Sequence, residues 1–351
     1  MLSLQFKVIG LEKSFDIENL KLIFEKASNV VITCHVSPDG DAIGASLCLW
    51  HVMRNLGKNA VVLTPDILPK SLSFLPGADE IISYSNNSLR AREIVSASDL
   101  IFCLDYNNLS RLDSMQSLIK ESIVTKVLID HHLDPERFTD YIFSDSTSSS
   151  TCLLLFQILS KLNYGDLIDK DAAECVYTGM MTDTGNFTYN SSDPSLYIAI
   201  SQLLERGIDK DKIYSVVCNT NSESRLRLCG YALNQKMTLY YEHKAALIVL
   251  NKEDLVHYNY KNGDTEGLVN IPLSVPGIVY SAFIREDDNY IKISMRSKGD
   301  FPVNVICEKY FNGGGHLNAA GGEFCGSLLD AVSLFQSILK ENDKYLENGK
   351  E

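Results

Sequence analysis

The chain has 351 residues, which is enough for two domains of ordinary size. Its composition, 45% hydrophobic and 22% charged, is that of a globular protein and excludes a disordered, collagen-like or disulfide-stapled chain. Lys and Arg number 32 and Asp and Glu number 45, and the resulting net charge of −13 argues against a general nucleic-acid binder with a basic surface. A local pocket for phosphate groups stays compatible with that charge.

The nine cysteines are scattered, and no two of them have Cys-x-x-Cys spacing. A zinc ribbon and a thioredoxin-type site are therefore not supported, and free thiols in a reducing cytoplasm are expected. Residues 1–10 lack the apolar core of a signal peptide, and no apolar run is long enough to cross a bilayer. We expect a cytoplasmic protein with no membrane partner.

The first half of the chain alternates between strand and helix patterns. Short apolar, largely β-branched runs predict strands at 30–33, 60–64, 100–104 and 126–129. Apolar residues at helical spacing predict helices at 42–56, 152–162 and 172–181. This alternation predicts an α/β domain with a doubly wound, mainly parallel sheet.

The second half of the chain has a different pattern of predicted secondary structure. Residues 194–235 are polar and helical in pattern and predict a connector, and strands at 245–250, 278–284 and 290–295 predict a smaller α+β domain. A glycine-rich turn at 313–315 and a closing helix at 328–339 complete it. The predicted boundaries are 1–193 for the first domain, 194–235 for the connector, 236–343 for the second domain and 344–351 for a frayed tail.

Acidic and histidine side chains follow three of the predicted strands: His35, Asp39, Asp41, Asp105, Asp130, His131 and His132. Any one of these aspartates alone would be read as a helix cap or a turn residue. Because the carboxyl ends of parallel strands meet at one edge, we expect all seven side chains to lie close together. No basic run stands beside them, and burying such like charges unpaired would cost several kcal/mol per group. The sequence therefore predicts a divalent metal site.

The ligand types narrow the choice of metal. Carboxylates with imidazoles and no thiolate suit manganese or a similar ion better than a structural zinc. A carboxylate such as Asp105 could bridge two metals about 3.5–4 Å apart, the separation used in two-metal phosphoesterases.

At these residues the chain resembles the DHH phosphoesterase superfamily, which is named for the triplet Asp130-His131-His132. Further motifs are similar to those of the family and stand in its order: His35-x-x-Pro38-Asp39-Gly40-Asp41-Ala42-x-Gly44, Leu104-Asp105-Tyr106-Asn107, Gly179 to Phe187, Ser294-Met295-Arg296-Ser297, and Gly313-Gly314-Gly315-His316 to Gly321. Ala45 departs from the Ser that is common in the first motif. Size and arrangement most resemble the NrnA-like branch of oligoribonucleases and pAp phosphatases.

The resemblance implies a DHH catalytic domain followed by a DHH-associated, substrate-binding domain. It implies two Mn²⁺ ions, with Mg²⁺ or Co²⁺ as substitutes, on the ligands His35, Asp39, Asp41, Asp105, His131 and Asp183. Asp130 and His132 would orient ligands or touch the phosphate. In the mechanism that we expect, two metals activate a water, and Asp105 or a neighbouring carboxylate helps to manage its proton. The substrate would be held by Arg296, Gly313, Gly314, Gly315 and His316, which the resemblance places across a cleft from the metals.

Without the family resemblance, the glycine run and Arg296 of the second domain have other interpretations. Three consecutive glycines also form an ordinary flexible turn, and Arg296 alone would be read as a solvated surface side chain. The spacing matches neither a dinucleotide-binding fingerprint nor a P-loop. The Ser148–Thr151 segment, at a predicted helix start, favours capping over a phosphate contact.

The leading hypothesis is a manganese-dependent phosphoesterase that hydrolyses short oligoribonucleotides or small nucleotides such as pAp and pApA. Hydrolysis of polyphosphate or cyclic dinucleotides is the alternative within the enzyme class, and a catalytically silent nucleotide-binding regulator is the alternative outside it. Without a basic stripe, long duplex nucleic acid is not an expected partner. The sequence leaves a homodimer open.

Overall fold

The structure of the protein is a computed structural model that describes residues 17–219 and 221–347. The chain divides into two compact units after Asn219. The predicted connector therefore contributes α7 (Pro194–Glu205) and α8 (Lys210–Cys218) to the first unit and α9 (Glu223–Gln235) to the second. The predicted tail starts with a short helix, α13 (Lys344–Glu347), and residues 348–351 and 1–10 lie outside the described residues.

The first unit is built on six parallel strands in the order β3-β2-β1-β4-β5-β6, which confirms the predicted parallel sheet. The strands are β1 (Asn29–Thr33), β2 (Asn59–Thr64), β3 (Ile82–Ser83), β4 (Leu100–Leu104), β5 (Thr125–Asp130) and β6 (Tyr141–Ser144). The three central strands are almost entirely buried because helices cover both faces of the sheet. The edge strands β3 and β6 were not predicted, since both are short and only partly buried.

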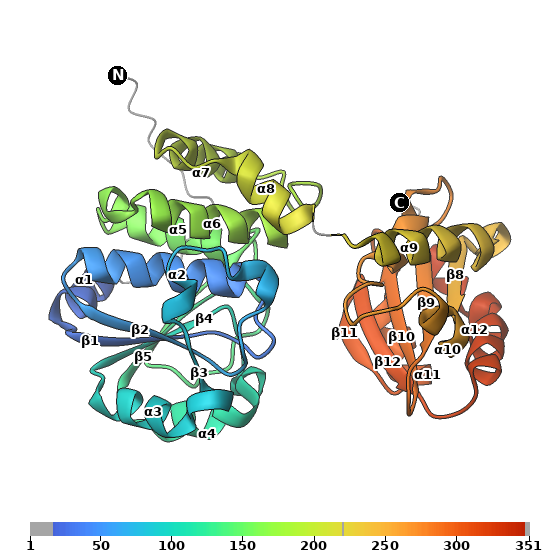
Figure 1. Ribbon diagram of the computed structural model, residues 1–351, viewed down its shortest axis with the longest axis horizontal. Helices are drawn as coiled ribbons and strands as arrows, with labels where there is room; N and C mark the ends of the chain where they lie inside the picture. The colour runs from blue at the N-terminus through green and yellow to red at the C-terminus, as the bar shows by residue number, and fades with distance from the viewer. Residues whose placement is uncertain (1–16, 220, 348–351) are drawn as a thin grey trace. The chain divides into compact units, whose positions relative to one another are not determined.

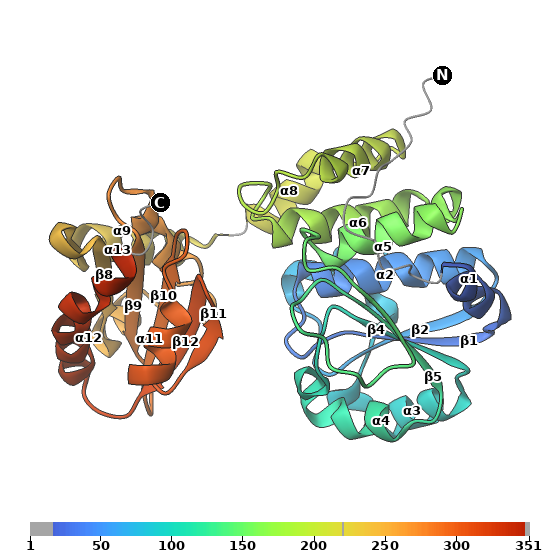
Figure 2. The same ribbon diagram turned by 180° about the vertical axis from the view of Figure 1, so that it is seen from behind.

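One face of this sheet is covered by a single layer of helices, and the other is covered by several layers (Figure 1). One face carries α3 (Tyr84–Ala97) and α4 (Gln116–Glu121), and the other carries α1 (Ile17–Lys26) and α2 (Gly40–Asn55). A further layer, α5 (Thr151–Lys161) and α6 (Lys170–Asp183), packs on α2, and α7 and α8 pack on that layer, as the reverse view in Figure 2 also shows. The largest hydrophobic core lies on the α2 side of the sheet.

Glycines let α2, α5 and α6 approach one another closely. A Cβ atom on Gly44 of α2 would lie 2.5 Å from the Cys175 carbonyl oxygen of α6. A Cβ atom on Gly179 of α6 would collide with the Cys152 sulfur of α5 and lie 3.0 Å from Asp41 Oδ1. This packing holds the acidic N-terminus of α2 beside the N-terminus of α5 and the C-terminal half of α6.

The second unit has a mixed sheet in the order β11-β12-β10-β9-β8-β7. Its strands are β7 (Met237–Tyr240), β8 (Ala245–Leu250), β9 (Tyr280–Glu286), β10 (Ile291–Ser297), β11 (Gly314–His316) and β12 (Ala319–Phe324), and only β8 and β9 pair in parallel. Hydrophobic cores on its two faces include residues of α11 (Val303–Tyr310) and α12 (Leu328–Asn342) on one side, and of α9 and α10 (Lys252–His257) on the other. The predicted α+β domain is confirmed, but the glycine run expected to form a turn enters strand β11.

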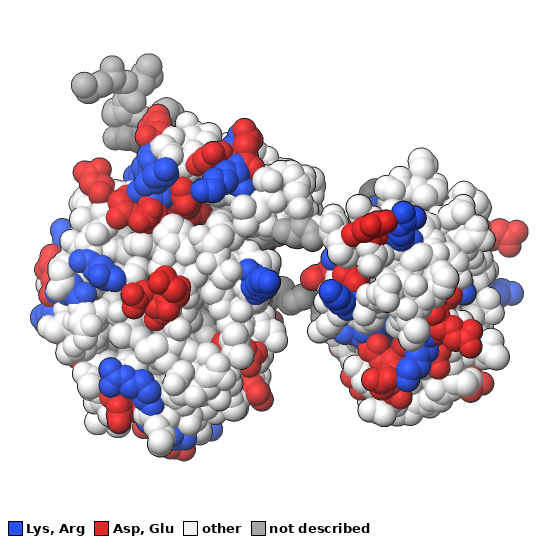
Figure 3. Space-filling view, in the orientation of Figure 1, with Lys and Arg blue, Asp and Glu red and all other residues white. Residues whose placement is uncertain are grey.

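Short 3₁₀ segments complete the described chain: η1 (Lys70–Leu72), η2 (Ala78–Glu80), η3 (Leu109–Met115), η4 (Gly165–Leu167), η5 (Tyr241–His243) and η6 (Leu268–Ser274). Across residues 17–219 and 221–347, no helix is both long and apolar enough to pass through a membrane. On the face of each unit drawn in Figure 3, basic and acidic side chains are interspersed.

Candidate metal centre

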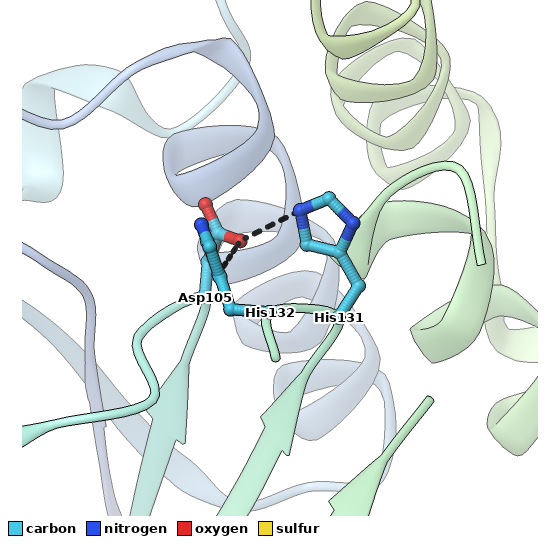
Figure 4. A group of neighbouring side chains, drawn as sticks. All are labelled: Asp105, His131 and His132. Carbon is cyan, nitrogen blue, oxygen red and sulfur yellow. Dashed lines mark ion pairs between the residues drawn. The ribbon is translucent and has the colours of Figure 1, made fainter. Parts of the chain in front are cut away.

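The central strands β1, β4 and β5 deliver polar side chains to one edge of the sheet. His35 follows β1 by two residues, Asp105 directly follows β4, and β5 ends at Asp130, so that His131 and His132 come next. In Figure 4, Asp105 and the two histidines lie side by side at the ends of neighbouring strands. Strand β1 pairs with β2 along one edge and with β4 along its other edge, so the order of the strands reverses between β1 and β4. Such a switch in strand order is where open α/β sheets form their sites.

The start of α2 contributes two carboxylates. Asp39 is its N-cap residue, and its Oδ1 accepts hydrogen bonds from the backbone N–H groups of Asp41 and Ala42, both at 3.0 Å. The Asp41 side chain is buried against the N-terminus of α5, where Thr151 N–H donates to Oδ2 at 2.7 Å and Cys152 N–H donates to Oδ1 at 2.9 Å. The unpaired N–H groups of a helix start thus hold a buried carboxylate in one orientation.

The side chains form two sets that meet at Asp105. In the first set, His35 Nε2 lies 3.4 Å from Asp105 Oδ2 and 3.8 Å from Asp39 Oδ1. In the second set, His131 Nε2 lies 3.5 Å from Asp183 Oδ2 and 3.9 Å from Asp41 Oδ2. The other oxygen of Asp105, Oδ1, is 3.7 Å from His131 Nε2. Asp105 therefore presents one oxygen to each set, as a carboxylate that bridges two ions would.

Backbone carbonyls fix the two histidine rings. His35 Nδ1 is 2.8 Å from the Val36 carbonyl oxygen, and His131 Nδ1 is 3.3 Å from that of Ser148. Because a carbonyl only accepts, Nδ1 carries the hydrogen in each ring when it is neutral, and the Nε2 lone pair faces the carboxylates. This is the usual arrangement around a metal-binding histidine.

The remaining residues of the DHH triplet form a pair. Asp130 is fully buried, and its Oδ1 lies 2.8 Å from His132 Nδ1. His132 Nδ1 is also 3.7 Å from Asp105 Oδ1, so its ring packs at the rim of the same cluster. Asp130 thus fixes the orientation of His132, with Nε2 directed away from the carboxylate.

Burial and neighbouring charges shift the pKa values of several side chains in the cluster. Burial opposes a charge on His35, but the carboxylates of Asp105 and Asp39, which lie 3.4 and 3.8 Å from Nε2, outweigh burial and raise the pKa of His35 to about 10. Burial raises the pKa of Asp183 to about 6, against the opposing effect of His131. Burial, together with the charges of Asp105 and Asp183, also raises the pKa of Asp41 well above its ordinary value. Burial and the neighbouring carboxylates therefore disfavour the charged forms of Asp41 and Asp183.

The donor set fits divalent cations. Ligand atoms within 4.8 Å of one another fall into the groups His35, Asp39 and Asp105; Asp41, His131 and Asp183; and Asp105, His131 and His132. In the described part of the chain, the buried atoms His35 Nε2 and Asp130 Oδ2 have no hydrogen-bond partner. Carboxylates with imidazole nitrogens and no thiolate are suited to Mn²⁺ and similar ions. The first two groups contain all six residues that the sequence analysis expected to be ligands.

In the second unit, the structure brings two of the expected substrate-binding residues together. Arg296 on β10 and His316 on β11 both pair in register with Ala319 on the intervening strand β12. Cross-strand partners share a face of a sheet, so the two side chains flank a small residue on one face. Arg296 NH1 also donates to the Met295 carbonyl at 2.9 Å.

The glycine run at 313–315 packs closely against strand β12. Cβ atoms on Gly313 and Gly315 would collide with the backbone of β12, and Gly315 has φ of +140°. Gly314 pairs with Gly321 of the same strand. The three glycines therefore let this segment lie directly against β12.

Two residues at the metal centre are not predicted from the sequence. The Ser148–Thr151 segment favours helix capping in the sequence, but the Thr151 hydroxyl also donates to Asp105 Oδ1 at 2.8 Å. Arg111 in η3 was not singled out, and its NH1 lies 3.5 Å from His132 Nε2. A hydroxyl-rich helix start was a signal for the first, whereas nothing in the sequence pattern marked the second.

Comparison with known proteins gives the family. The model of the DHH family N-terminal domain matches residues 29–180, and that of the DHHA1 domain matches residues 244–348. The chain is 29% identical over 327 residues to the bifunctional oligoribonuclease and PAP phosphatase NrnA of Thermus thermophilus, covering 92% of this chain and 93% of the relative. It is 27% identical to the protein of the same name from Bacillus subtilis, covering 83% and 88%.

A solved structure is similar to nearly the whole chain. An exopolyphosphatase-related protein from Bacteroides fragilis is 46% identical, with a TM-score of 0.91 over 94% of this chain and 97% of that one. The two domain matches together span most of the sequence, and so does each of these relatives. The chain belongs to the DHH family and consists of its N-terminal domain followed by a DHHA1 domain.

Proposed function

We propose that this protein is a manganese-dependent phosphoesterase that hydrolyses short oligoribonucleotides and small nucleotides such as pAp and pApA. The observation that carries the proposal is the pair of ligand sets that share Asp105, one containing His35 and the other His131. Similarity over most of the chain to relatives named as bifunctional oligoribonucleases and PAP phosphatases supports the substrate class.

The six proposed ligands divide between two ions: His35, Asp39 and Asp105 for one, and Asp41, Asp105, His131 and Asp183 for the other. Bound metal ions supply Lewis acidity, a water of lowered pKa and charge for the oxygens of an in-line displacement. The choice of Mn²⁺ rests on the donor types, with Mg²⁺ or Co²⁺ as substitutes.

The chain's own residues have distinct parts in the proposed reaction. Asp105, held by the Thr151 hydroxyl, stands between the two sets and is placed to accept a proton from the attacking water. Asp130 holds Nδ1 of His132, which leaves Nε2 free of that carboxylate and able to contact a phosphate oxygen or exchange a proton with the substrate. Burial of Asp105 and Asp130 keeps bulk water from competing for these carboxylates.

The DHHA1 unit is proposed to bind substrate. Arg296 and His316, on one face of neighbouring strands, form a basic pair suited to a terminal phosphate. The net charge of −13 does not favour a long duplex as substrate. All nine cysteines are free, which suits the proposed cytoplasmic setting.

A substrate panel tests the proposal. The purified chain is incubated with pAp, labelled oligoribonucleotides of two to ten residues, polyphosphate and a cyclic dinucleotide, each with Mn²⁺, Mg²⁺, Co²⁺ or Zn²⁺. We expect the highest kcat/KM on pAp and the shortest oligoribonucleotides with Mn²⁺.

Polyphosphate is the second candidate substrate, because the 46% identical solved structure carries the description "exopolyphosphatase-related". Preference for polyphosphate in the panel would replace the nucleotide assignment. Tight nucleotide binding without turnover under any metal would instead make the chain a regulator. Gel filtration of the same preparation measures whether the chain forms a homodimer.

A further inference from the structure

A half-buried arginine stands at the rim of the carboxylate cluster. Arg111 NH1 lies 3.5 Å from His132 Nε2. Within residues 17–219 and 221–347, His132 is the one hydrogen-bond partner of the Arg111 guanidinium. In the same residues, Arg111 forms no ion pair with a carboxylate. The side chain is therefore close to the carboxylate cluster without forming an ion pair with it.

The fold holds the backbone of Arg111 firmly. Its N–H donates to the Asn108 carbonyl at 3.1 Å, in the turn that opens η3. Its carbonyl accepts from Val36 N–H at 2.7 Å, which ties η3 to the loop that carries His35. Both are backbone bonds, so they survive any change of the side chain.

The chemistry of the guanidinium indicates what it binds. The group is charged at all accessible pH values and carries five N–H donors, of which one reaches His132 over a long distance. A planar fork of donors matches phosphate oxygens, and bonds between such charged groups are about twice as strong as neutral ones. The remaining N–H groups of Arg111 can therefore bind an anion. They lie beside a site that is proposed to act on phosphate esters.

We propose that Arg111 is a phosphate-binding residue of the metal centre and contacts a non-bridging oxygen of the substrate phosphate, next to His132. This inference rests on the proposed function, since it takes the substrate to be a phosphate ester. Asp130, His132 and Arg111 then form one line, in which the carboxylate orients the imidazole and the guanidinium shares the phosphate with it.

Equilibrium binding of AMP in the presence of Mn²⁺, measured by calorimetry, tests the contact without any need for turnover. We expect Arg111→Gln to raise the Kd for AMP by about 10- to 100-fold, the loss of one charge-assisted contact. Arg111→Lys keeps the charge but not the fork, and should fall between wild type and Arg111→Gln. Arg90→Gln is the matched control, because Arg90 is exposed and pairs with Glu93 on α3.

Two further readouts separate phosphate binding from a purely structural role. Manganese affinity, measured in the same titrations without AMP, should be the same in Arg111→Gln and wild type. Guanidinium ion at millimolar concentration should restore AMP binding to Arg111→Ala but not alter wild type. Unchanged AMP affinity in folded Arg111→Gln, or lost manganese affinity, would overturn the assignment. Absence of hydrolysis by the wild type in the substrate panel would refute the proposed function instead.

Discussion

The hydroxyl of Thr151 donates to Asp105 Oδ1 at 2.8 Å, and the backbone N–H of the same residue donates to Asp41 Oδ2 at 2.7 Å. The start of one helix thus fixes two carboxylates that come from a strand end and from another helix. Both carboxylates are buried, and both belong to the proposed ligand set. Thr151 is therefore a positioning residue, which sets where the ligands stand before any cation arrives.

Replacing Thr151 by Val tests this role, because the change removes the hydroxyl and keeps the backbone bond to Asp41. We expect manganese affinity and kcat each to fall by about 10- to 100-fold, as for other residues that orient metal ligands. Calorimetric titration with Mn²⁺ and steady-state kinetics measure the two effects. Thr178→Val is the control, since that buried hydroxyl bonds only within α6, to the Glu174 carbonyl. Equal losses in both variants would argue against positioning by Thr151.

Substitution of the proposed ligands should have larger effects. His131→Ala and Asp183→Ala each remove a ligand atom from the set around Asp41, and Asp130→Ala releases the His132 ring. We expect near-total loss of hydrolysis, at least about 100-fold, because even residues that only orient ligands cost 10- to 100-fold. Circular dichroism should show the fold retained, and substantial turnover in His131→Ala would remove that residue from the site.

The close packing of α2, α5 and α6 gives a prediction about stability. Gly179→Ala places a methyl group against the Cys152 sulfur and near Asp41 Oδ1, so we expect a loss of about 1–3 kcal/mol in unfolding free energy and a fall in activity. Gly230→Ala in α9, where nothing lies within 4 Å of the new methyl group, should be neutral or stabilising by up to about 1 kcal/mol. Urea unfolding of both variants measures the difference, and similar values would contradict the packing argument.

Asp254 gives the second unit a pH-dependent contribution to stability. Burial alone would raise its pKa, but hydrogen bonds from Lys236 Nζ at 2.9 Å and Tyr231 OH at 2.7 Å outweigh burial and lower the pKa below its ordinary value of 3.8. A lowered pKa means that the contribution is complete above about pH 4–5 and is lost as the pH falls through the folded-state pKa. At pH 7, Asp254→Asn should cost about 1–3 kcal/mol.

The same change should cost progressively less below pH 4, which urea unfolding at several pH values measures. Asp288→Asn is the matched control, because Asp288 also pairs with a lysine, Lys252, but its side chain is 83% exposed. We expect no measurable effect of that change at any pH. A constant penalty for Asp254→Asn across the pH range would mean that its charge is not what stabilises the unit.

The sequence predicted the central strands and the convergence of their acidic ends, because buried apolar runs followed by aspartates are local patterns. It did not predict β11 and β12, since segments such as Ala319–Phe324 are rich in glycine and alanine and become strands only by pairing with β10. The fold class is confirmed, whereas the ligand assignments stay predictions that the geometry supports.

The residues that the sequence did not reveal act across long separations in the chain. Thr151 reaches a carboxylate 46 positions away, and Arg111 reaches His132 over 21 positions. Asp183, at the end of a helix far along the chain, entered the ligand set only through the family resemblance. Tertiary packing of α6 on α2 places it there, and no periodicity in the sequence encodes that contact.

Metal-dependent hydrolysis of a short nucleotide tests the central claim most directly. The protein is freed of metal with EDTA, desalted and titrated with MnCl₂ while pApA hydrolysis and bound manganese are measured together. The account predicts no hydrolysis at the start, two Mn²⁺ bound per chain at saturation, and turnover that rises as the second ion binds. Full hydrolysis of pApA by the metal-free protein, or by Asp183→Ala at saturating Mn²⁺, would contradict it.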